Sequence, residues 1–206
     1  PPGRDGAAWT GARTPQRVVL AVGNAVPGKG LPEAIRAFIT ARLPGARLVV
    51  AGDLGRNPHE RGLVEDAAAG AGGAVELAGV LSPDALAERY GSARVLLTAS
   101  RYEGWPISVG EAMASGVPVV GYDVPGMREL IRHGGEGLLV PPGDIPALAD
   151  ELRRVWRDAD LAAQLGNAAR RKATQWPTWA ETASRAVGLI HRAAIGATAD
   201  QLSRSR

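Results

Sequence analysis

The stretch GNAVPGKGL, residues 23–31, follows an apolar run and precedes a helical pattern, and its lysine and glycines could bind phosphate. It matches the beginning of the P-loop pattern, G-x-x-x-x-G-K, in which backbone amides hold phosphates and the lysine reaches the terminal ones. The next residue should carry a hydroxyl for Mg²⁺, but it is Gly30, and Pro27 removes one amide donor. Lys29 before a helix start still predicts an anion site, because a helix N-terminus presents free amides. A solvated lysine on an ordinary strand–helix turn is the alternative.

A second stretch, EGWPISVGE, holds two carboxylates, Glu103 and Glu111. Ser108 and Glu111 form S-x-x-E, a capping box, which predicts a helix that begins at Ser108. Glu103 then lies in the loop before that helix, and Glu111 lies one turn inside it, so both border the same helix N-terminus. The alternative is that Glu111 is only a capping residue and Glu103 only a loop charge.

The two stretches together suggest a class of ligand. A carboxylate is a poor neighbour for phosphate, but it accepts hydrogen bonds from two adjacent hydroxyls. A lysine in one loop and two glutamates in another therefore suit a molecule with phosphates in its middle and polyhydroxyl rings at both ends. A nucleotide-activated sugar has that form.

Metal-binding patterns carry less weight in this chain. Asp158 and Asp160 form a D-x-D, but acids at a helix start explain that pair, and the three histidines are scattered without ligand spacing. No metal site is predicted.

Strand and helix patterns alternate along the chain, and they must position these residues. The predicted strands are residues 17–23, 46–53, 74–79, 94–100, 117–123 and 137–142. The predicted helices between them are residues 31–43 and 58–71, one that starts after Ser82, and one at 107–115, with two or three more within 145–195. The strands are near-continuous apolar runs, as in a parallel sheet covered on both faces.

The fold class is therefore α/β, a Rossmann-like parallel sheet of about six strands with helices on both faces and extra C-terminal helices. Ligands of such sheets bind outside the carboxyl ends of the strands. The loops that start at Gly23, Gly52, Gly79 and Arg101 should converge there. The pattern G-x-G-x-x-G is absent after the first strand, which argues against a nicotinamide or flavin cofactor.

Composition bounds the organisation of the chain. Its 206 residues, 45% hydrophobic and 22% charged, suffice for one sizeable domain, and the absence of cysteine excludes disulfides. The sequence predicts a linker or arm over residues 1–15, the nucleotide-sugar-binding domain over residues 16–196 and a disordered tail over residues 197–206. The chain begins with Pro1, which suggests a fragment of a longer protein. With a net charge of +3 and 4% aromatic residues, nucleic acid is not a predicted partner.

The sequence becomes specific when the motifs are combined. EGWPISVGE, followed by AMASGVPVVGYDVPGMREL and GEGLLVPPGD, resembles the family 4 retaining glycosyltransferases of GT-B fold. The resemblance covers nearly the whole ordered chain and implies that this domain is one half of a GT-B fold. It implies a UDP- or GDP-sugar donor, no metal or other cofactor, and an acceptor glycan, lipid or small molecule held by a separate N-terminal domain.

The resemblance also implies roles for individual residues. Lys29 would contact the diphosphate and stabilise the leaving group, Glu103 would contact the donor sugar, and Glu111 the ribose; Lys29 and Glu103 are the predicted catalytic residues. The other predicted contacts of the nucleotide sugar are Gly23, Asn24, Gly52, Gly79, Val80, Gly104, Trp105, Pro106, Ile107 and Ser108. Gly79 and Val80 would lie near the base.

One position departs from the family. The family usually has arginine after the glycine of the first strand, paired with the lysine on the diphosphate, and this chain has Asn24. Arg101 and Arg128 are candidates to replace that cation.

Three functions remain open from the sequence. The favoured one is a hexosyltransferase-like donor domain, incomplete without its acceptor domain. The others are a nucleotide-sugar-binding module without turnover and a P-loop-like nucleotidase. The arginine-rich C-terminal helices predict solvated faces, with peripheral membrane contact as the alternative, so the expected location is the cytoplasm or the inner face of the membrane.

Overall fold

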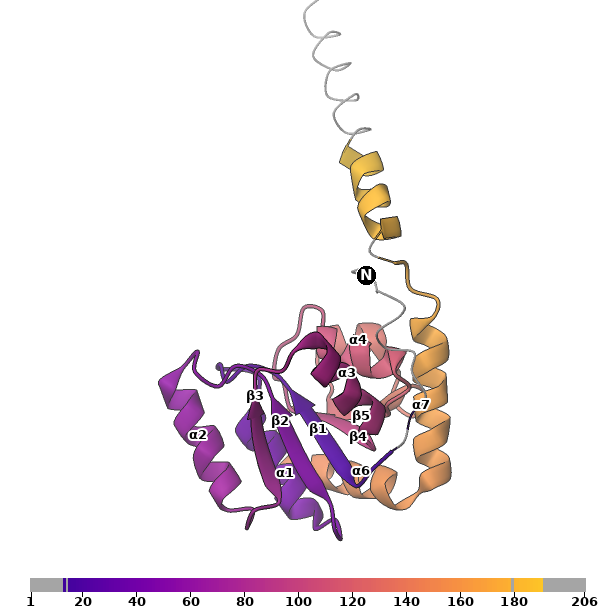
Figure 1. Ribbon diagram of the computed structural model, residues 1–206. Coiled ribbons are helices and arrows are strands. Elements are labelled where there is room, and N and C mark those ends of the chain that lie inside the picture. Colours follow the sequence, from indigo (N-terminus) through magenta and orange to yellow (C-terminus); the bar gives the residue numbers. More distant parts are fainter. Residues whose placement is uncertain (1–12, 14, 179, 191–206) are drawn as a thin grey trace, which may run out of the picture. The chain divides into compact units, whose positions relative to one another are not determined.

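The computed structural model describes residues 13, 15–178 and 180–190 (Figure 1). Their contacts divide the described chain into two compact units, with the boundary in the sequence between Thr174 and Gln175. The predicted tail, residues 197–206, lies outside the described residues, as does most of the predicted arm. Arg13, within that arm, donates to the carbonyl oxygen of Ala93 at 2.5 Å and to that of Gly116.

The larger unit is built on six parallel strands in the order β3-β2-β1-β4-β5-β6. Their bounds are β1 Val18–Val22, β2 Arg47–Ala51, β3 Val75–Gly79, β4 Val95–Thr98, β5 Val119–Tyr122 and β6 Gly137–Val140. The strand order reverses between β1 and β4, which pair at Val19 with Val95 and at Leu20 with Leu96. This reversal is the topological switch point, where open α/β sheets bind ligands.

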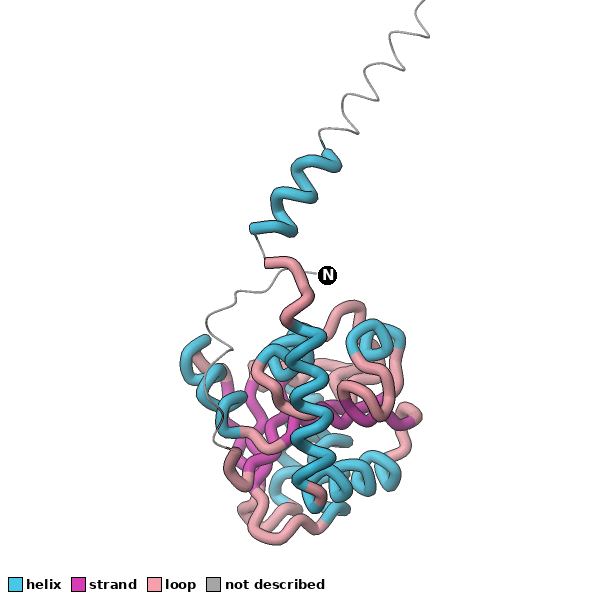
Figure 2. The backbone as a smooth tube through the Cα atoms, turned by 90° about the vertical axis from the view of Figure 1, so that its right-hand side faces the viewer, coloured by secondary structure: helices cyan, strands magenta, loops and turns pink. Residues whose placement is uncertain are grey.

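The described part of this unit contains seven helices. They are α1 Leu31–Ala41, α2 Pro58–Ala69, α3 Pro83–Ser92, α4 Ile107–Ala114, α5 Pro125–Leu130, α6 Ile145–Arg157 and α7 Ala159–Ala173. Helix α1 packs against α2 and α6, and α4 packs against α7. Figures 1 and 2 show helices on both faces of the sheet. The predicted α/β architecture is confirmed.

Burial of the strand interiors explains why the strands appear in the sequence as near-continuous apolar runs. The interior residues of β1, β2, β4 and β5 are buried, and the less buried ones lie at strand ends, because helices cover both faces of the sheet. The expected alternation of a half-exposed strand is therefore absent from them. Two tyrosines, Tyr90 and Tyr122, are also completely buried.

The sequence analysis missed one helix and correctly expected the C-terminal ones. Helix α5 is short and begins with Pro125, whose fixed φ suits the first helical position. In the second unit, residues 180–190 are helical. The backbone amide of Thr178 donates to the carboxylate of Glu181 at 2.7 Å, and the amide of Glu181 donates to the hydroxyl of Thr178 at 3.2 Å, a capping box. No helix in the described part of the chain has the length and apolar character needed to cross a membrane.

Candidate functional site

The loops that follow β1 and β4 are fastened together at the switch point. Gly30 has φ +63° and precedes α1, and a Cβ atom on it would lie 2.0 Å from the carbonyl oxygen of Ala99. The amide of Arg101 donates to the carbonyl of Gly28 at 2.8 Å. The close approach explains Gly30, because the serine or threonine of a P-loop would collide with the neighbouring backbone here. This steric constraint explains why the sequence matches only part of the P-loop pattern.

This junction brings the two predicted chemical segments into contact. Nζ of Lys29 lies 2.7 Å from Oε1 of Glu103. The side chain of Lys29 is 36% exposed and that of Glu103 only 10%. A carboxylate with so little exposure needs a cation or several donors, and Lys29 provides the charge. Helix α5 supports the same loop, since the amide of Gly126 donates to the carbonyl of Glu103 at 3.1 Å.

Glu111 lies inside α4, the helix that follows this loop. The predicted capping box is wrong: α4 begins at Ile107, Pro106 is its N-cap residue, and no side chain caps it. Ser108 is therefore already helical, so its hydroxyl does not occupy the capping position. The carboxylate of Glu111 instead bonds to the hydroxyl of Tyr90, which donates to its Oε2 at 3.0 Å.

Burial raises the pKa of Glu111 above the ordinary glutamate value, and the Tyr90 hydrogen bond opposes that shift. Burial also raises the pKa of Tyr90, with the Glu111 charge acting in the same direction. Tyr90 thus stays neutral and acts as a hydrogen-bond donor to Glu111. The sequence analysis did not identify Tyr90, because nothing local to α3 marks it as a partner of α4.

A second junction fastens the loops after β1 and β2. A Cβ atom on Gly52 would lie 2.0 Å from the carbonyl oxygen of Gly23. The amide of Asp53 donates to Oδ1 of Asn24 at 3.0 Å. The amide of Gly52 donates to the carbonyl of Gly79 at 2.8 Å, which extends the contact to the end of β3. The predicted convergence of these glycine-containing loops is confirmed.

Asn24 therefore has a structural partner of its own. Its side-chain oxygen accepts a hydrogen bond from a backbone amide, and arginine has no acceptor with which to replace that bond. The asparagine is thus suited to this junction rather than merely a missing cation.

A family model described as Glycosyl transferases group 1 matches residues 8–172. The chain belongs to this family. An exopolysaccharide phosphotransferase of Streptomyces coelicolor is 37% identical over 155 residues, 73% of this chain and 16% of that protein. An alpha-D-kanosaminyltransferase of Streptomyces kanamyceticus is 32% identical over 146 residues, 70% of this chain and 37% of that protein. The chain thus spans less than half the length of either relative.

A solved structure gives the same result for the fold. Anabaena HepE in complex with UDP and glucose superposes with a TM-score of 0.82 at 20% identity, over 92% of this chain and 55% of that one. The sheet and its helices form one half of a GT-B glycosyltransferase fold.

The two arginines considered as substitute cations are held by carboxylates of this group 1 glycosyltransferase domain. Nε of Arg101 lies 2.8 Å from Oε1 of Glu33, and Nε of Arg128 lies 2.6 Å from Oδ1 of Asp123. Glu33 also accepts a hydrogen bond of 2.6 Å from Tyr122. Both guanidinium groups are paired with carboxylates other than Glu103, and Lys29 is the cation that faces Glu103.

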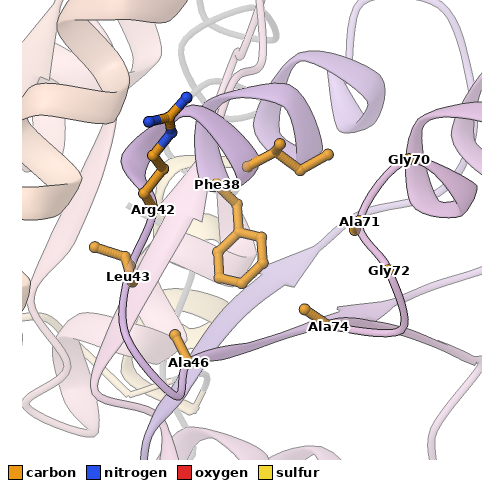
Figure 3. Close-up of a pocket in the computed structure, with 9 residues that line it drawn as sticks. Phe38, Arg42, Leu43, Ala46, Gly70, Ala71, Gly72 and Ala74 are labelled. Atoms are coloured by element: carbon orange, nitrogen blue, oxygen red, sulfur yellow. The ribbon is translucent and has the colours of Figure 1, made fainter.

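Two cavities differ in their position on the sheet. One of 230 Å³ borders the switch-point loop and is lined by Gly28, Gly30, Glu33, Arg36 and Arg101 among others. The other, of 390 Å³, is drawn in Figure 3 and is lined largely by apolar groups such as Phe38 and Leu43, beside Arg42. It includes Ala46 and Ala74, which directly precede β2 and β3, so it lies at the amino ends of the strands, away from Lys29 and Glu103.

The remaining predicted contacts of the glycosyltransferase site lie at the loop tips. Val80 is 74% exposed after β3, Ile107 is exposed at the start of α4, and a Cβ atom on Gly79 or Gly104 would meet open space. Trp105 is half-buried and Pro106 is buried. Within the described ranges, no three His, Cys, Asp or Glu side chains are grouped so that they could hold a metal. Asp158 of the D-x-D caps α7, accepting from the amide of Leu161 at 2.8 Å.

Proposed function

We propose that this domain binds a nucleoside-diphosphate sugar at the switch point between β1 and β4. The observation that carries the proposal is the ion pair between Lys29 and Glu103, 2.7 Å apart, at the edge where a Rossmann-like sheet binds its ligands. Glu111, in the helix that follows the Glu103 loop, supplies a second carboxylate. One cation and two separated carboxylates suit a diphosphate with a polyhydroxyl ring at either end.

Each group then has one task. Lys29 turns from Glu103 to the diphosphate, where its charge is needed as the bond between sugar and phosphate breaks. Glu103, once released, accepts hydrogen bonds from hydroxyls of the donor sugar. The first amides of α4, around Ile107 and Ser108, donate to phosphate oxygens. Fixed charge and amide dipoles of this kind stabilise a leaving anion without a metal ion.

The reaction proposed is retaining glycosyl transfer of the family 4 type. The acceptor hydroxyl would attack the sugar from the face that the diphosphate leaves, and its proton would pass to an oxygen of the departing diphosphate. A glycan, lipid or small-molecule acceptor would be held by another domain of the protein, because this chain spans less than half of its relatives. The complex of HepE with UDP and glucose supports a UDP-sugar as the first donor to test, with GDP-sugars as the alternative. A location in the cytoplasm, or at the inner face of the membrane, stays a prediction.

Calorimetry tests donor binding directly. The chain is titrated with UDP, GDP, UDP-glucose and GDP-mannose without metal, and separately with ATP and Mg²⁺. We expect binding of at least one nucleoside diphosphate in the presence of EDTA, and binding weaker by about tenfold to a hundredfold in Lys29→Ala. Binding of ATP alone, dependent on Mg²⁺, would replace the proposal with a P-loop-like nucleotidase.

A binding module without turnover is the second candidate, and Asn24 favours it. The cation that the family usually places there is absent, and Arg101 and Arg128 are paired with carboxylates. A turnover assay separates the two candidates, because only a transferase releases UDP or GDP from a bound sugar donor in the presence of acceptors.

A further inference from the structure

Tyr90 links two helices that are distant in the sequence. It lies near the end of α3, is completely buried, and its hydroxyl points at α4. The hydroxyl oxygen lies 3.0 Å from Oε2 of Glu111 and 3.0 Å from the carbonyl oxygen of Ser108. A phenol has one hydrogen to donate, so the two acceptors share it. The carbonyl of Ser108 lies in the first turn of α4. The Tyr90 hydroxyl therefore holds both the start of this helix and the carboxylate of Glu111 in place.

The two oxygens of Glu111 are in different situations. Oε2 accepts from Tyr90, whereas no hydrogen bond to Oε1 is present among the described residues. Oε1 is also not among the buried polar atoms left without a partner there. Each carboxylate oxygen can accept more than one hydrogen bond. Oε1 and the second acceptor site of Oε2 therefore remain for a ligand.

We propose that Tyr90 is a positioning residue, which fixes the carboxylate of Glu111 so that it accepts hydrogen bonds from the ribose hydroxyls and makes the domain prefer ribonucleotides to deoxyribonucleotides. The inference rests on the proposed function. Tyr90 is too deeply buried to touch the nucleotide, so it acts through Glu111.

The geometry argues for this role in two steps. A glutamate side chain has three rotatable bonds, and a carboxylate that samples several rotamers must be ordered when the ligand binds. A donor from a buried and rigid ring removes that cost beforehand. The same hydrogen bond favours the ionised form of the half-buried carboxylate, since it opposes the larger effect of burial, which raises the pKa of Glu111.

A matched control is present in the same domain. Tyr122 is equally buried, and its hydroxyl donates to a carboxylate as well, Oε2 of Glu33 at 2.6 Å. Tyr90→Phe and Tyr122→Phe therefore remove the same group from the same kind of environment. If Tyr90 only stabilises the fold, the two variants should behave alike toward ligands.

The test compares ribose with deoxyribose in the same variant. Of UDP, GDP and ADP, the nucleotide that the unaltered chain binds most tightly is measured against its 2′-deoxy and 3′-deoxy analogues. We expect the unaltered chain and Tyr122→Phe to prefer the ribonucleotide, and Tyr90→Phe to lose about tenfold of that preference. A general loosening of the fold would lower the affinities for all three ligands together and leave their ratio intact.

Tyrosine-selective ¹³C labelling provides a measurement that needs no folded Tyr90 variant. The chain has three tyrosines, and Tyr122→Phe and Tyr102→Phe assign their ring signals. We expect the Cζ signal of Tyr90 to shift when the ribonucleotide binds and to shift less with the deoxy analogues. A Tyr90 signal that responds equally to all three ligands overturns the inference.

The outcomes separate this inference from the proposed function. If the unaltered chain binds no nucleoside diphosphate, both fail. If it binds one without preferring ribose, the Glu111 assignment and the role of Tyr90 fail, while the diphosphate site stands. If it prefers ribose and Tyr90→Phe keeps the full preference, only the role of Tyr90 is overturned.

Discussion

Two junctions between loops flank β1. Both place a glycine against a neighbouring backbone carbonyl, but the side-chain interactions beside the two glycines differ. On the β4 side, Gly30 lies against the carbonyl of Ala99, and on the β2 side, Gly52 lies against the carbonyl of Gly23, each at a distance that leaves no room for a Cβ atom. The first junction carries a Lys29–Glu103 ion pair. The second carries the neutral hydrogen bond of Asn24 to the Asp53 amide.

The difference shows where this fold can change without unfolding. An ion pair can open and offer both charges to a ligand, and its partners regain interactions there. A side chain bonded to a partly buried backbone amide has no such exchange, because breaking the hydrogen bond leaves that donor without its protein partner. The β4 side therefore suits ligand binding, and the β2 side suits a fixed wall beside it.

Substitution of either close-packed glycine should have the largest effect. Gly30→Ser would restore the P-loop sequence, but its Cβ atom would overlap the Ala99 carbonyl, and φ +63° adds backbone strain. Gly52→Ala meets the Gly23 carbonyl in the same way. We expect each to cost about 3 kcal/mol or more of unfolding free energy, measured by urea denaturation. Gly28→Ala is the control, because it has a positive φ but open space around it. Gly30→Ser that folds normally and binds ATP with Mg²⁺ would contradict the steric argument.

Removal of the Lys29 charge should have the next largest effect, and it should act on binding. A charge-assisted contact with a diphosphate contributes a few kcal/mol, so Lys29→Ala should weaken nucleoside-diphosphate binding about tenfold to a hundredfold in calorimetry. The bare nucleoside should be nearly unaffected, because it offers nothing for the ammonium to pair with.

Lys29→Ala also leaves Glu103 nearly buried beside no cation. The double variant with Glu103→Gln should therefore recover part of any stability that the single variant loses, whereas it should not recover diphosphate affinity. Arg61→Ala, which breaks an exposed ion pair with Glu65 on α2, is the control for loss of a surface charge. Full recovery of affinity in the double variant would mean that the lysine acts only as the partner of Glu103.

Asn24 should show the opposite balance of effects. Asn24→Arg removes the acceptor for the Asp53 amide, so we expect a loss of about 1–2 kcal/mol in unfolding free energy and no gain in diphosphate affinity. Asn24→Asp keeps an acceptor at that position and should retain more stability. A clear gain in affinity for Asn24→Arg at unchanged stability would show that the two junctions are not as different as their bonding suggests.

The sequence predicted those parts of the molecule that depend on local pattern. The apolar strands, the N-cap Ser82 of α3 and the switch-point loops were recognisable because buried strands and capping residues leave local signals. The convergence of the loops that carry Lys29 and Glu103 followed from the topology, since loops after neighbouring parallel strands meet, but the ion pair between the two side chains was not predicted.

Contacts between distant segments were not predictable in the same way. Ser108 and Glu111 fit a capping box, but Pro106 starts the helix earlier, and the carboxylate has a partner from another helix. The reason for Gly30 and Asn24 lies in the backbone of Ala99 and Asp53, which no local pattern reveals. In the sequence alone, both residues look like departures from a known motif, and only their contacts with the neighbouring loop explain them.

Glu111→Gln should change stability least, and it extends the comparison to α4. Burial raises the pKa of Glu111 in the folded state, with the Tyr90 hydroxyl, the group bonded to this carboxylate, acting in the opposite direction. A carboxyl whose folded pKa is raised contributes stability that is complete below the unfolded pKa, near the ordinary value of 4.5, and is lost as pH rises through the folded pKa. Glutamine does not titrate, so the variant avoids that loss. The difference in melting temperature, variant minus unaltered chain, should therefore grow in favour of the variant from about pH 4 upward and level off above the folded pKa.

At neutral pH the same variant should bind the nucleoside diphosphate more weakly, because an amide is a weaker acceptor for ribose hydroxyls than a carboxylate. Thermal unfolding across this pH range, with Glu65→Gln on the exposed side of α2 as the control, measures the first effect, and calorimetry measures the second. If the difference in melting temperature instead shrinks as pH rises, the folded protein stabilises the charged form of Glu111. Groups other than Tyr90 would then have to provide that stabilisation.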